Sequence, residues 1–290
     1  MRASTFTLVI SAILLPFAAA VPAARAPTDR VLTPGGFRAA SNITVIPTGG
    51  SLAHVGSEIH VFDSTGKVVS KHAATRQPTK TTPVAPEETG WVADANWFNN
   101  GVPIGSFKTT WSVPAVPASW VGQTIFLFNS IEPGTFDAIM QPVLQYGGSA
   151  AGGGQFWSVA TWYLYGDNTF FTTPVQVGVG QVLNGIVELV GTGAGNTFNY
   201  NSQFTNIGGT ALTVVGGEEL KWATLTLESY GVTGPSTYPA GSTVFSQTNL
   251  ELSDGTFPSI TWSTLSDPAD GISTTVNTGG STAAVITITY

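Results

Sequence analysis

The sequence predicts an all-β protein in which two antiparallel sheets pack as a β-sandwich or jelly roll. Short runs rich in Val, Ile, Thr and aromatic residues are separated by Gly, Asn and Pro. No stretch keeps the 3.6-residue apolar period of an amphipathic helix. No internal repeat of fixed period is present, which argues against a propeller or a solenoid.

The predicted strands follow one another closely from residue 90 onward, a region that we call the body (90–290). They cover residues 106–114, 123–131, 137–148, 156–167, 173–191, 196–204, 211–216, 221–232, 259–265 and 283–290. Cysteine is absent from the chain. A secreted domain without disulfides needs a large core, and about 200 residues are enough to build one.

The first residues have the pattern of a secretory signal peptide, assigned to residues 1–20. Arg2 precedes an apolar run that ends in small residues near Ala20. The run is shorter than a bilayer span and contains Pro16, and no later segment offers about 20 uninterrupted apolar residues. We therefore expect a secreted, extracellular protein with no membrane partner. The glycosylation signal at Asn42 fits export.

The segment between signal and body, residues 21–89, is a basic leader. Eight of the ten basic residues precede residue 81, and all three histidines lie there too. The body carries twelve carboxylates against two lysines, a net charge of −10. These opposite charges indicate an inhibitory propeptide that loosens as carboxylates protonate below pH ~4. The alternative is a basic strand pair that belongs permanently to the domain, and residues 56–72 have the pattern of a hairpin.

The composition of the body excludes several kinds of site. Without histidine or cysteine it cannot form a Ser-His-Asp or Cys-His site, or a histidine-bound zinc. No phosphate-binding glycine loop is present. No basic patch remains for nucleic acid. We expect no metal and no cofactor, so carboxylates, amides, hydroxyls and aromatic rings must supply the chemistry.

Alternation along two strands predicts a polar and aromatic face. In the strand around Glu228, the residues Trp222, Thr226, Glu228 and Tyr230 point the same way. In residues 156–167 the same spacing groups Trp157, Thr161, Tyr163 and Tyr165. A sandwich with such a face has a groove for an extended polymer.

Two glutamines make the strand at residues 137–148 unusual. Gln141 and Gln145 share one face of this strand, and Pro142 interrupts it. A buried amide needs a hydrogen-bond partner, since an unpaired one costs about 1–3 kcal/mol. A strand with two such residues therefore points to a polar site.

Several short motifs in the body resemble those of the fungal glutamic peptidases, or eqolisins. The matching stretches are "ANW" at residues 95–97, "FKTTWSVP", "AIMQ" at residues 138–141, "VATWYLYGD", "VQVGVGQVL" and "TLESYG". The resemblance extends from Trp91 to about Tyr230. It implies a concanavalin A-like sandwich that is made as a zymogen, with a propeptide removed in acid.

The resemblance implies a catalytic pair of Gln141 and Glu228, with Gln145 as a competitor for the glutamine role. The carboxylate would take a proton from water, and the amide would donate to the developing oxyanion. An extended polypeptide is the implied substrate, and a monomer is expected. The residues assigned to substrate binding are Trp97, Glu132, Gln145, Trp157, Trp162, Tyr163, Thr226 and Tyr230.

A carbohydrate-binding or glucanase-like protein is the alternative function. The residues that favour it are Trp157, Trp162, Tyr163, Asn199 and Asn201. A retaining glycosidase needs two carboxylates about 5–5.5 Å apart, and Thr226 occupies the position on the strand where a partner of Glu228 would stand. A lectin needs no such pair. A secreted structural protein without catalysis is the third possibility.

Overall fold

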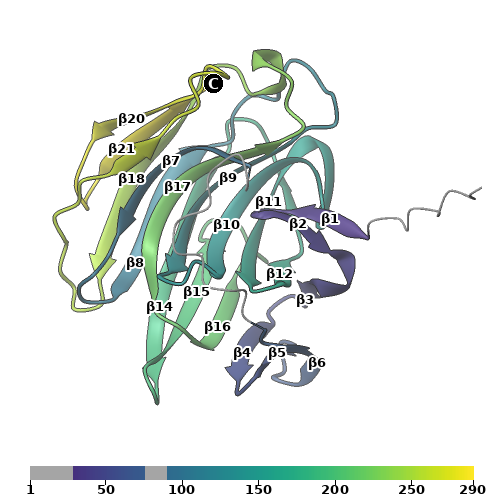
Figure 1. Cartoon of the computed structure of the whole chain (residues 1–290), viewed down its shortest axis with the longest axis vertical. Coiled ribbons are helices and arrows are strands. Elements are labelled where there is room, and N and C mark those ends of the chain that lie inside the picture. The colour runs from purple at the N-terminus through teal and green to yellow at the C-terminus, as the bar shows by residue number, and fades with distance from the viewer. Residues whose placement is uncertain (1–28, 76–89) are drawn as a thin grey trace, which may run out of the picture.

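The computed structural model describes residues 29–75 and 90–290 (Figure 1). The predicted signal peptide and the segment joining leader to body lie outside these ranges. Among the residues described, no helix has the length and apolar character needed to cross a membrane. The same residues contain no α-helix, only the short 3-10 helices η1 (Ala40–Asn42) and η2 (Pro235–Thr237), so the all-β prediction is confirmed.

One large sheet, which we call the front sheet, has nine strands. In spatial order they are β19 (Ser263–Leu265), β7 (Trp91–Phe98), β17 (Leu220–Tyr230), β9 (Thr124–Pro133), β10 (Ala138–Ser149), β11 (Gly152–Tyr165), β12 (Asn168–Thr172) and β3 (Ile43–Ile46), with β13 (Val175–Val177) paired to β11.

The other large sheet, the back sheet, has ten strands. In spatial order they are β20 (Ser273–Thr278), β21 (Ala284–Thr289), β18 (Ser242–Leu252), β8 (Ile104–Ser112), β14 (Val182–Gly193), β15 (Thr197–Phe204), β16 (Leu212–Gly217), β4 (Ser51–Val55), β5 (Glu58–Phe62) and β6 (Val68–Ala73). A separate hairpin consists of β1 (Arg30–Thr33) and β2 (Gly36–Ala39).

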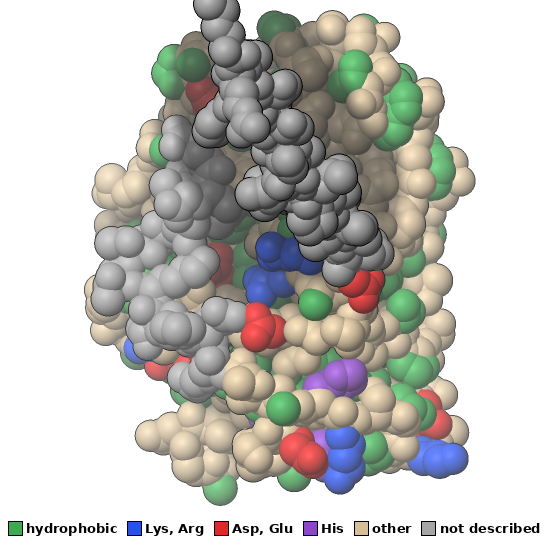
Figure 2. Space-filling model, turned by 45° about the vertical axis from the view of Figure 1, so that its right-hand side comes forward, with side chains coloured by type: hydrophobic (Ala, Val, Ile, Leu, Met, Phe, Trp, Pro, Cys, Tyr) green, Lys and Arg blue, Asp and Glu red, His purple; other side chains and the backbone are tan. Residues whose placement is uncertain are grey.

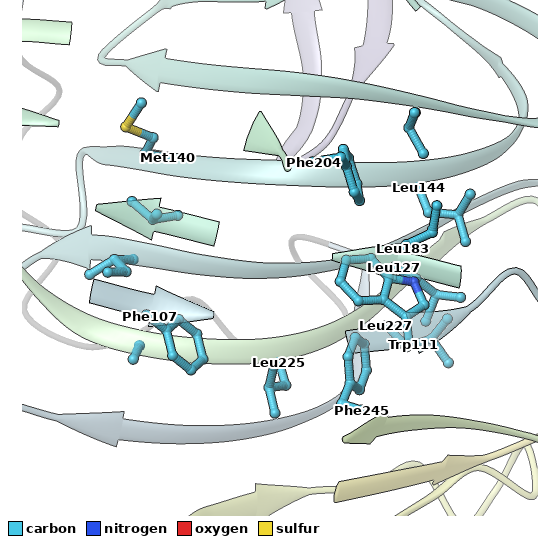
Figure 3. Packing of buried hydrophobic residues seen from close by; sticks show 14 of the residues in the cluster. Phe107, Trp111, Leu127, Met140, Leu144, Leu183, Phe204, Leu225, Leu227 and Phe245 are labelled. Atoms are coloured by element: carbon cyan, nitrogen blue, oxygen red, sulfur yellow. The ribbon is translucent and has the colours of Figure 1, made fainter. Parts of the chain in front are cut away.

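The main hydrophobic core lies between the two sheets (Figure 3). Side chains of successive strand residues alternate between faces, so each strand supplies every second residue to this core. The front sheet contributes Leu127, Met140, Leu144, Leu225 and Leu227. The back sheet contributes Phe107, Trp111, Leu183, Phe204 and Phe245. This inter-sheet packing confirms the predicted sandwich.

The opposite face of the front sheet is also buried and carries a second apolar cluster. Its buried members include Phe126, Phe128, Ile139, Val143 and Trp162. Leu32 and Ile43 of the leader pack against them. The front sheet is therefore covered on both sides, once by the back sheet and once by the leader.

The leader adds strands to both large sheets. Strand β3 pairs with β12, and β4 pairs with β16, and both pairings are parallel. The pairings described among strands of the body are all antiparallel, as predicted, and the two parallel ones arise where a segment from outside the body joins an edge strand, which it can do in either direction. The hairpin predicted at residues 56–72 is formed by β5 and β6.

Packing of leader residues into the main core generates a stability prediction. Val61 of β5 is fully buried in that core, whereas Val69 of β6 is 48% exposed. Val61→Ala should lower the free energy of unfolding by about 2 kcal/mol, and Val69→Ala should change it by less than about 0.5 kcal/mol. Urea denaturation of the precursor measures both. Equal effects would mean that the leader is not part of the cooperative core.

Candidate active site

Glu228 lies in the middle of the front sheet, on the face covered by the leader. It is directly opposite Phe126 of β9 on one side and Trp91 of β7 on the other. The pairing with β7 shifts register between Leu227 and Glu228, so that β7 has one extra residue there. Such a bulge re-aims side chains, and here it puts the Trp91 ring rather than Val92 beside Glu228.

The Glu228 carboxyl group is fully buried. Its Oε1 accepts hydrogen bonds from the Gly35 backbone N–H (2.7 Å) and from the Tyr230 hydroxyl (2.5 Å). Its Oε2 has no hydrogen-bond partner among the described residues. Burial raises the pKa of Glu228 to about 8, and the hydrogen bonds from Tyr230, Gly35 and Trp91 oppose part of that rise.

The β1–β2 hairpin of the leader covers Glu228. Its turn places Gly35 over the carboxyl group, with φ +84°, a conformation that favours glycine. A Cβ on this residue would also come within 3.2 Å of Leu164. The hairpin is anchored by Arg38, whose Nη1 donates to the Gly166 carbonyl (2.6 Å), and by the Leu32 carbonyl, which accepts from the Ala150 N–H (2.7 Å).

The charged contact between hairpin and body is made by Arg38. Its guanidinium lies near Asp167 and Glu228, and its pKa is lowered, chiefly by burial. Figure 2 shows basic side chains in the hollow of this face, next to acidic ones. The remaining contacts described between hairpin and body are backbone hydrogen bonds and apolar packing.

Cross-strand register decides which glutamine lies level with Glu228. Strand β9 separates β17 from β10, and its Phe126 is opposite both Glu228 and Gln145. Gln145 and Glu228 therefore stand in one row, about 10 Å apart between Cα atoms, and both side chains can lean over Phe126. Gln141 lies four residues further along β10, about 13 Å away in the strand direction. By register, Gln145 rather than Gln141 is level with Glu228, although its amide is bonded within the β10–β11 turn.

The Gln145 amide is held by the turn that joins β10 to β11. Its Nε2 donates to the carbonyls of Gly147 and Gly152 (both 2.8 Å), and its Oε1 accepts from the Ser149 hydroxyl (2.7 Å). The same turn carries Ala150, which donates to Leu32 of the leader. The leader thus contacts both the segment that holds Gln145 and the carboxyl group of Glu228.

Gln141 is fully buried, and neither atom of its amide has a partner among the described residues. It stands opposite Trp162 of β11, on the same face as Glu228. An unpaired buried amide of this kind destabilises the fold by about 1–3 kcal/mol. The Gln141 amide is therefore a second buried polar group on the face of the front sheet that carries Glu228.

The other predicted binding residues divide between the two faces of the front sheet. Glu132, Trp162, Thr226 and Tyr230 lie on the face that carries Glu228. In contrast, Trp97, Trp157 and Tyr163 point to the inter-sheet core. Alternation correctly grouped Trp157 with Tyr163, but the face that they share is the core. These three residues therefore do not line a surface with Glu228.

The residues that favoured a glycan site are scattered in the same way. Trp157 and Tyr163 are buried in the core, and Trp162 is buried on the opposite face. Asn199 and Asn201 lie on β15 of the back sheet, where their side chains bond to Gly216 and Thr213. They form no common platform.

Sequence reasoning missed Asp94 as a member of this site. Asp94 is buried on β7, directly opposite Thr226, and so lies on the Glu228 face one row away. Burial raises its pKa to about 6, against a hydrogen bond from Asn96 (2.6 Å) that lowers it. The available signal was the alternation of "VADANW", which puts Asp94 and Asn96 on the same side.

A metal site is not evident in the part of the chain that the structure describes. There, no three or more His, Asp or Glu side chains gather closely enough to hold an ion.

No protein-family model matches the chain, and no curated protein matches it in sequence. Among solved structures, it is similar to scytalido-glutamic peptidase bound to a transition state analog inhibitor, at 12% identity and a TM-score of 0.45. It is also similar to SCP-B, an eqolisin-family peptidase in complex with the tripeptide Ala-Ile-His, at 13% identity and a TM-score of 0.46. Each alignment covers 69% of this chain and 98% of the other.

A third solved structure is the CBM2 module of the evolved Dit of Lactobacillus casei BL23 phage J-1. Its identity to this chain is 14% and its TM-score is 0.31, over 48% of this chain and 61% of that one.

Burial of Glu228 generates a prediction on stability against pH. The folded-state pKa of about 8 lies above the ordinary value of 4.5, so the folded protein binds this proton more tightly. The stabilisation is therefore complete below pH 4.5 and is lost progressively as the pH rises through 8, by up to about 5 kcal/mol. Glu228→Gln cannot ionise and should escape this loss.

Urea denaturation of the precursor at pH 5 and pH 9 measures the effect. The two proteins should have similar stability at pH 5, and the variant should be more stable at pH 9. Because Asp94 is common to both, its own titration cancels in the comparison. Parallel stability curves across this range would show that the Glu228 carboxyl group is not buried as described.

Proposed function

We propose that this protein is a secreted glutamic endopeptidase, active in acid, whose catalytic pair is Glu228 and Gln145. One observation carries the proposal: a fully buried carboxyl group and an amide stand in a single row of the sheet, and a hairpin of the leader covers the carboxyl group. The motif resemblance of the body to glutamic peptidases supports it, with Gln145 taking the part first assigned to Gln141.

The chemistry uses only groups of this row and a water molecule. Glu228 Oε2 takes a proton from water, and the water oxygen bonds to the carbonyl carbon of the scissile peptide. Both N–H groups of Gln145 bond to the carbonyls of Gly147 and Gly152 in the covered state, so the amide must leave at least one of them before it donates a hydrogen bond to the resulting oxyanion. The proton on Oε2 then passes to the leaving nitrogen as the C–N bond breaks, which regenerates the carboxylate. An amide does not titrate and remains a donor in acid.

Glu228 must be ionised to act as a base, and its buried state prevents this in acid. With a pKa of about 8 under the hairpin, the carboxyl group is protonated below neutral pH. Removal of the hairpin would let water reach the group, and its pKa would fall toward the ordinary value of ~4.3. Exposure of the site is therefore part of activation.

The leader fits an inhibitory propeptide by its contacts. The Gly35 N–H donates to Oε1 of Glu228. The Leu32 carbonyl accepts from the Ala150 N–H, in the turn that also binds the Gln145 amide. Both members of the catalytic pair are thus restrained at once. The sequence suggested that opposite charges hold the leader on the body. The contacts described between them are mainly backbone hydrogen bonds and apolar packing, and Arg38 supplies the charged contact. An extended polypeptide is the proposed substrate, and a monomer is expected.

The activity prediction concerns the secreted precursor shifted from neutral pH to about pH 3.5, where the ordinary pKa of ~4.3 leaves about one exposed Glu228 carboxyl group in seven ionised and able to act as a base. An added denatured protein should be cleaved, and a new N-terminus of the chain should form before Trp91. Glu228→Gln should abolish cleavage. Gln145→Ala should lower kcat by about 100-fold or more, in line with loss of an oxyanion donor. Gln141→Ala is the matched control and should retain more activity.

Mass spectrometry of the chain and of the substrate measures both events. If Gln141→Ala abolishes cleavage while Gln145→Ala does not, the assignment of the pair reverts to Gln141. If the folded wild-type protein cuts nothing across the acid range, the peptidase proposal fails. Binding to a glycan panel would then test the carbohydrate alternative.

The hairpin generates a separate prediction on inhibition. Arg38→Ala removes a charged hydrogen bond of the type that contributes about 1.5–3 kcal/mol, so the hairpin should open at least about tenfold more often. The precursor variant should process itself correspondingly faster after acid shift. Lys67→Ala, in the exposed β5–β6 turn, is the control and should match wild type. Equal rates for both variants would contradict inhibition by the hairpin.

A further inference from the structure

We infer that Tyr230 is a positioning residue that fixes which oxygen of Glu228 exchanges a proton with the substrate water. The inference rests on the proposed role of Glu228 as the base. The Tyr230 hydroxyl donates to Oε1 at 2.5 Å, the shortest distance of any contact described for this carboxyl group. Sequence reasoning had assigned Tyr230 to substrate binding only.

The hydrogen bond between Tyr230 and Glu228 joins two residues of the same strand. Glu228 and Tyr230 are two residues apart on β17, so their side chains leave the same face of the front sheet. The Tyr230 ring is held between Phe126 of β9 and Phe37 of the hairpin, with ring centroids 6.4 and 6.0 Å away. The hydroxyl is thereby aimed along the strand at Oε1.

The two hydrogen-bond donors to Oε1 belong to different parts of the chain, so activation affects them differently. Gly35 belongs to the leader and departs with it, whereas Tyr230 belongs to the body and stays. After activation, Phe37 has left with the hairpin but Phe126 of β9 still packs against the Tyr230 ring, and the Tyr230 hydroxyl continues to donate to Oε1. The proton that Glu228 accepts must then go to Oε2, the oxygen that has no partner among the described residues.

The surroundings keep Tyr230 in the donor state. Burial, followed by the charge and hydrogen bond of Glu228, raises the pKa of the phenol well above its ordinary value. The phenol therefore stays protonated wherever the enzyme works. A charge-assisted O–H donor of this kind stabilises the carboxylate over the acid, so Tyr230 also opposes the rise in the Glu228 pKa that burial causes.

Other charged groups face this carboxyl group from neighbouring elements. Arg38 on β2 also lowers the Glu228 pKa, but it departs with the leader. Asp94 on β7 lies one row away, and Asp167 follows β11 and faces Arg38. Tyr230 is thus the hydroxyl donor that the body itself provides.

The test is a titration of Glu228 in the full-length precursor, by NMR of glutamate labelled with carbon-13 at the carboxyl carbon. The Glu228 signal is the one missing from Glu228→Gln. Tyr230→Phe should raise the pKa of Glu228 by about one unit. Tyr238→Phe is the matched control: it also loses a buried hydroxyl contact, with Ser229, on the opposite face of β17. It should leave the Glu228 pKa unchanged.

A second measurement covers the case in which Tyr230→Phe does not fold. Incorporation of 3-fluorotyrosine makes the phenol a stronger donor, and it should lower the pKa of Glu228. In the activated enzyme, the acid limb of the pH dependence of kcat should move upward for Tyr230→Phe, with KM little changed.

The outcomes separate this inference from the proposed function. An unchanged Glu228 pKa in Tyr230→Phe, or an equal shift in Tyr238→Phe, overturns the positioning role. If the pKa shifts as expected but the wild-type protein cleaves no peptide, Tyr230 does control the Glu228 proton, and the peptidase proposal is what fails.

Discussion

The burial of the Glu228 carboxyl group is the constraint on which the arrangement of this face depends. An ionised carboxylate without solvent destabilises a fold strongly unless it is hydrogen-bonded. Here Oε1 accepts from Tyr230 and Gly35, the Trp91 side chain also lowers the pKa of the group by hydrogen bonding, and Oε2 has no partner within hydrogen-bond distance among the described residues. Burial under the hairpin therefore favours the protonated form of this group.

The leader reaches this position because it is built into both sheets. Its β3 extends the front sheet, and its β4, β5 and β6 extend the back sheet. Its apolar residues Leu52, Ile59 and Val61 belong to the main core. With these strands fixed at the sheet edges, the β1–β2 hairpin is directed across the front sheet (Figure 1). In the described structure the leader is therefore part of the folded domain, and the proposed propeptide role would require it to leave strand pairings and core contacts behind.

The alternation of residues along the sequence predicted where many strands lie and which side chains of each strand share a face. Every segment predicted as a strand contains one, whereas β7, β12, β18 and β20 of the body were missed. Of these, β18 and β20 are rich in Ser, Thr and Asn, which gives them no clear apolar alternation. The pattern could not say which face of the front sheet carries the site, because both faces are buried and both carry aromatic residues. That is why Trp157 and Tyr163 were assigned to a groove although they lie in the core.

The sequence by itself determined the chemistry that is available. A body without histidine or cysteine leaves carboxylates and amides as the reactive groups, and alternation singled out Glu228 with Tyr230 beside it. Only the tertiary structure showed that Gln145 rather than Gln141 is level with Glu228, and only it placed Asp94 and the leader hairpin on the same face. The physical reason is register. Periodicity within a strand fixes which way a side chain points, but its level relative to a residue two strands away depends on hydrogen bonds between segments distant in the chain.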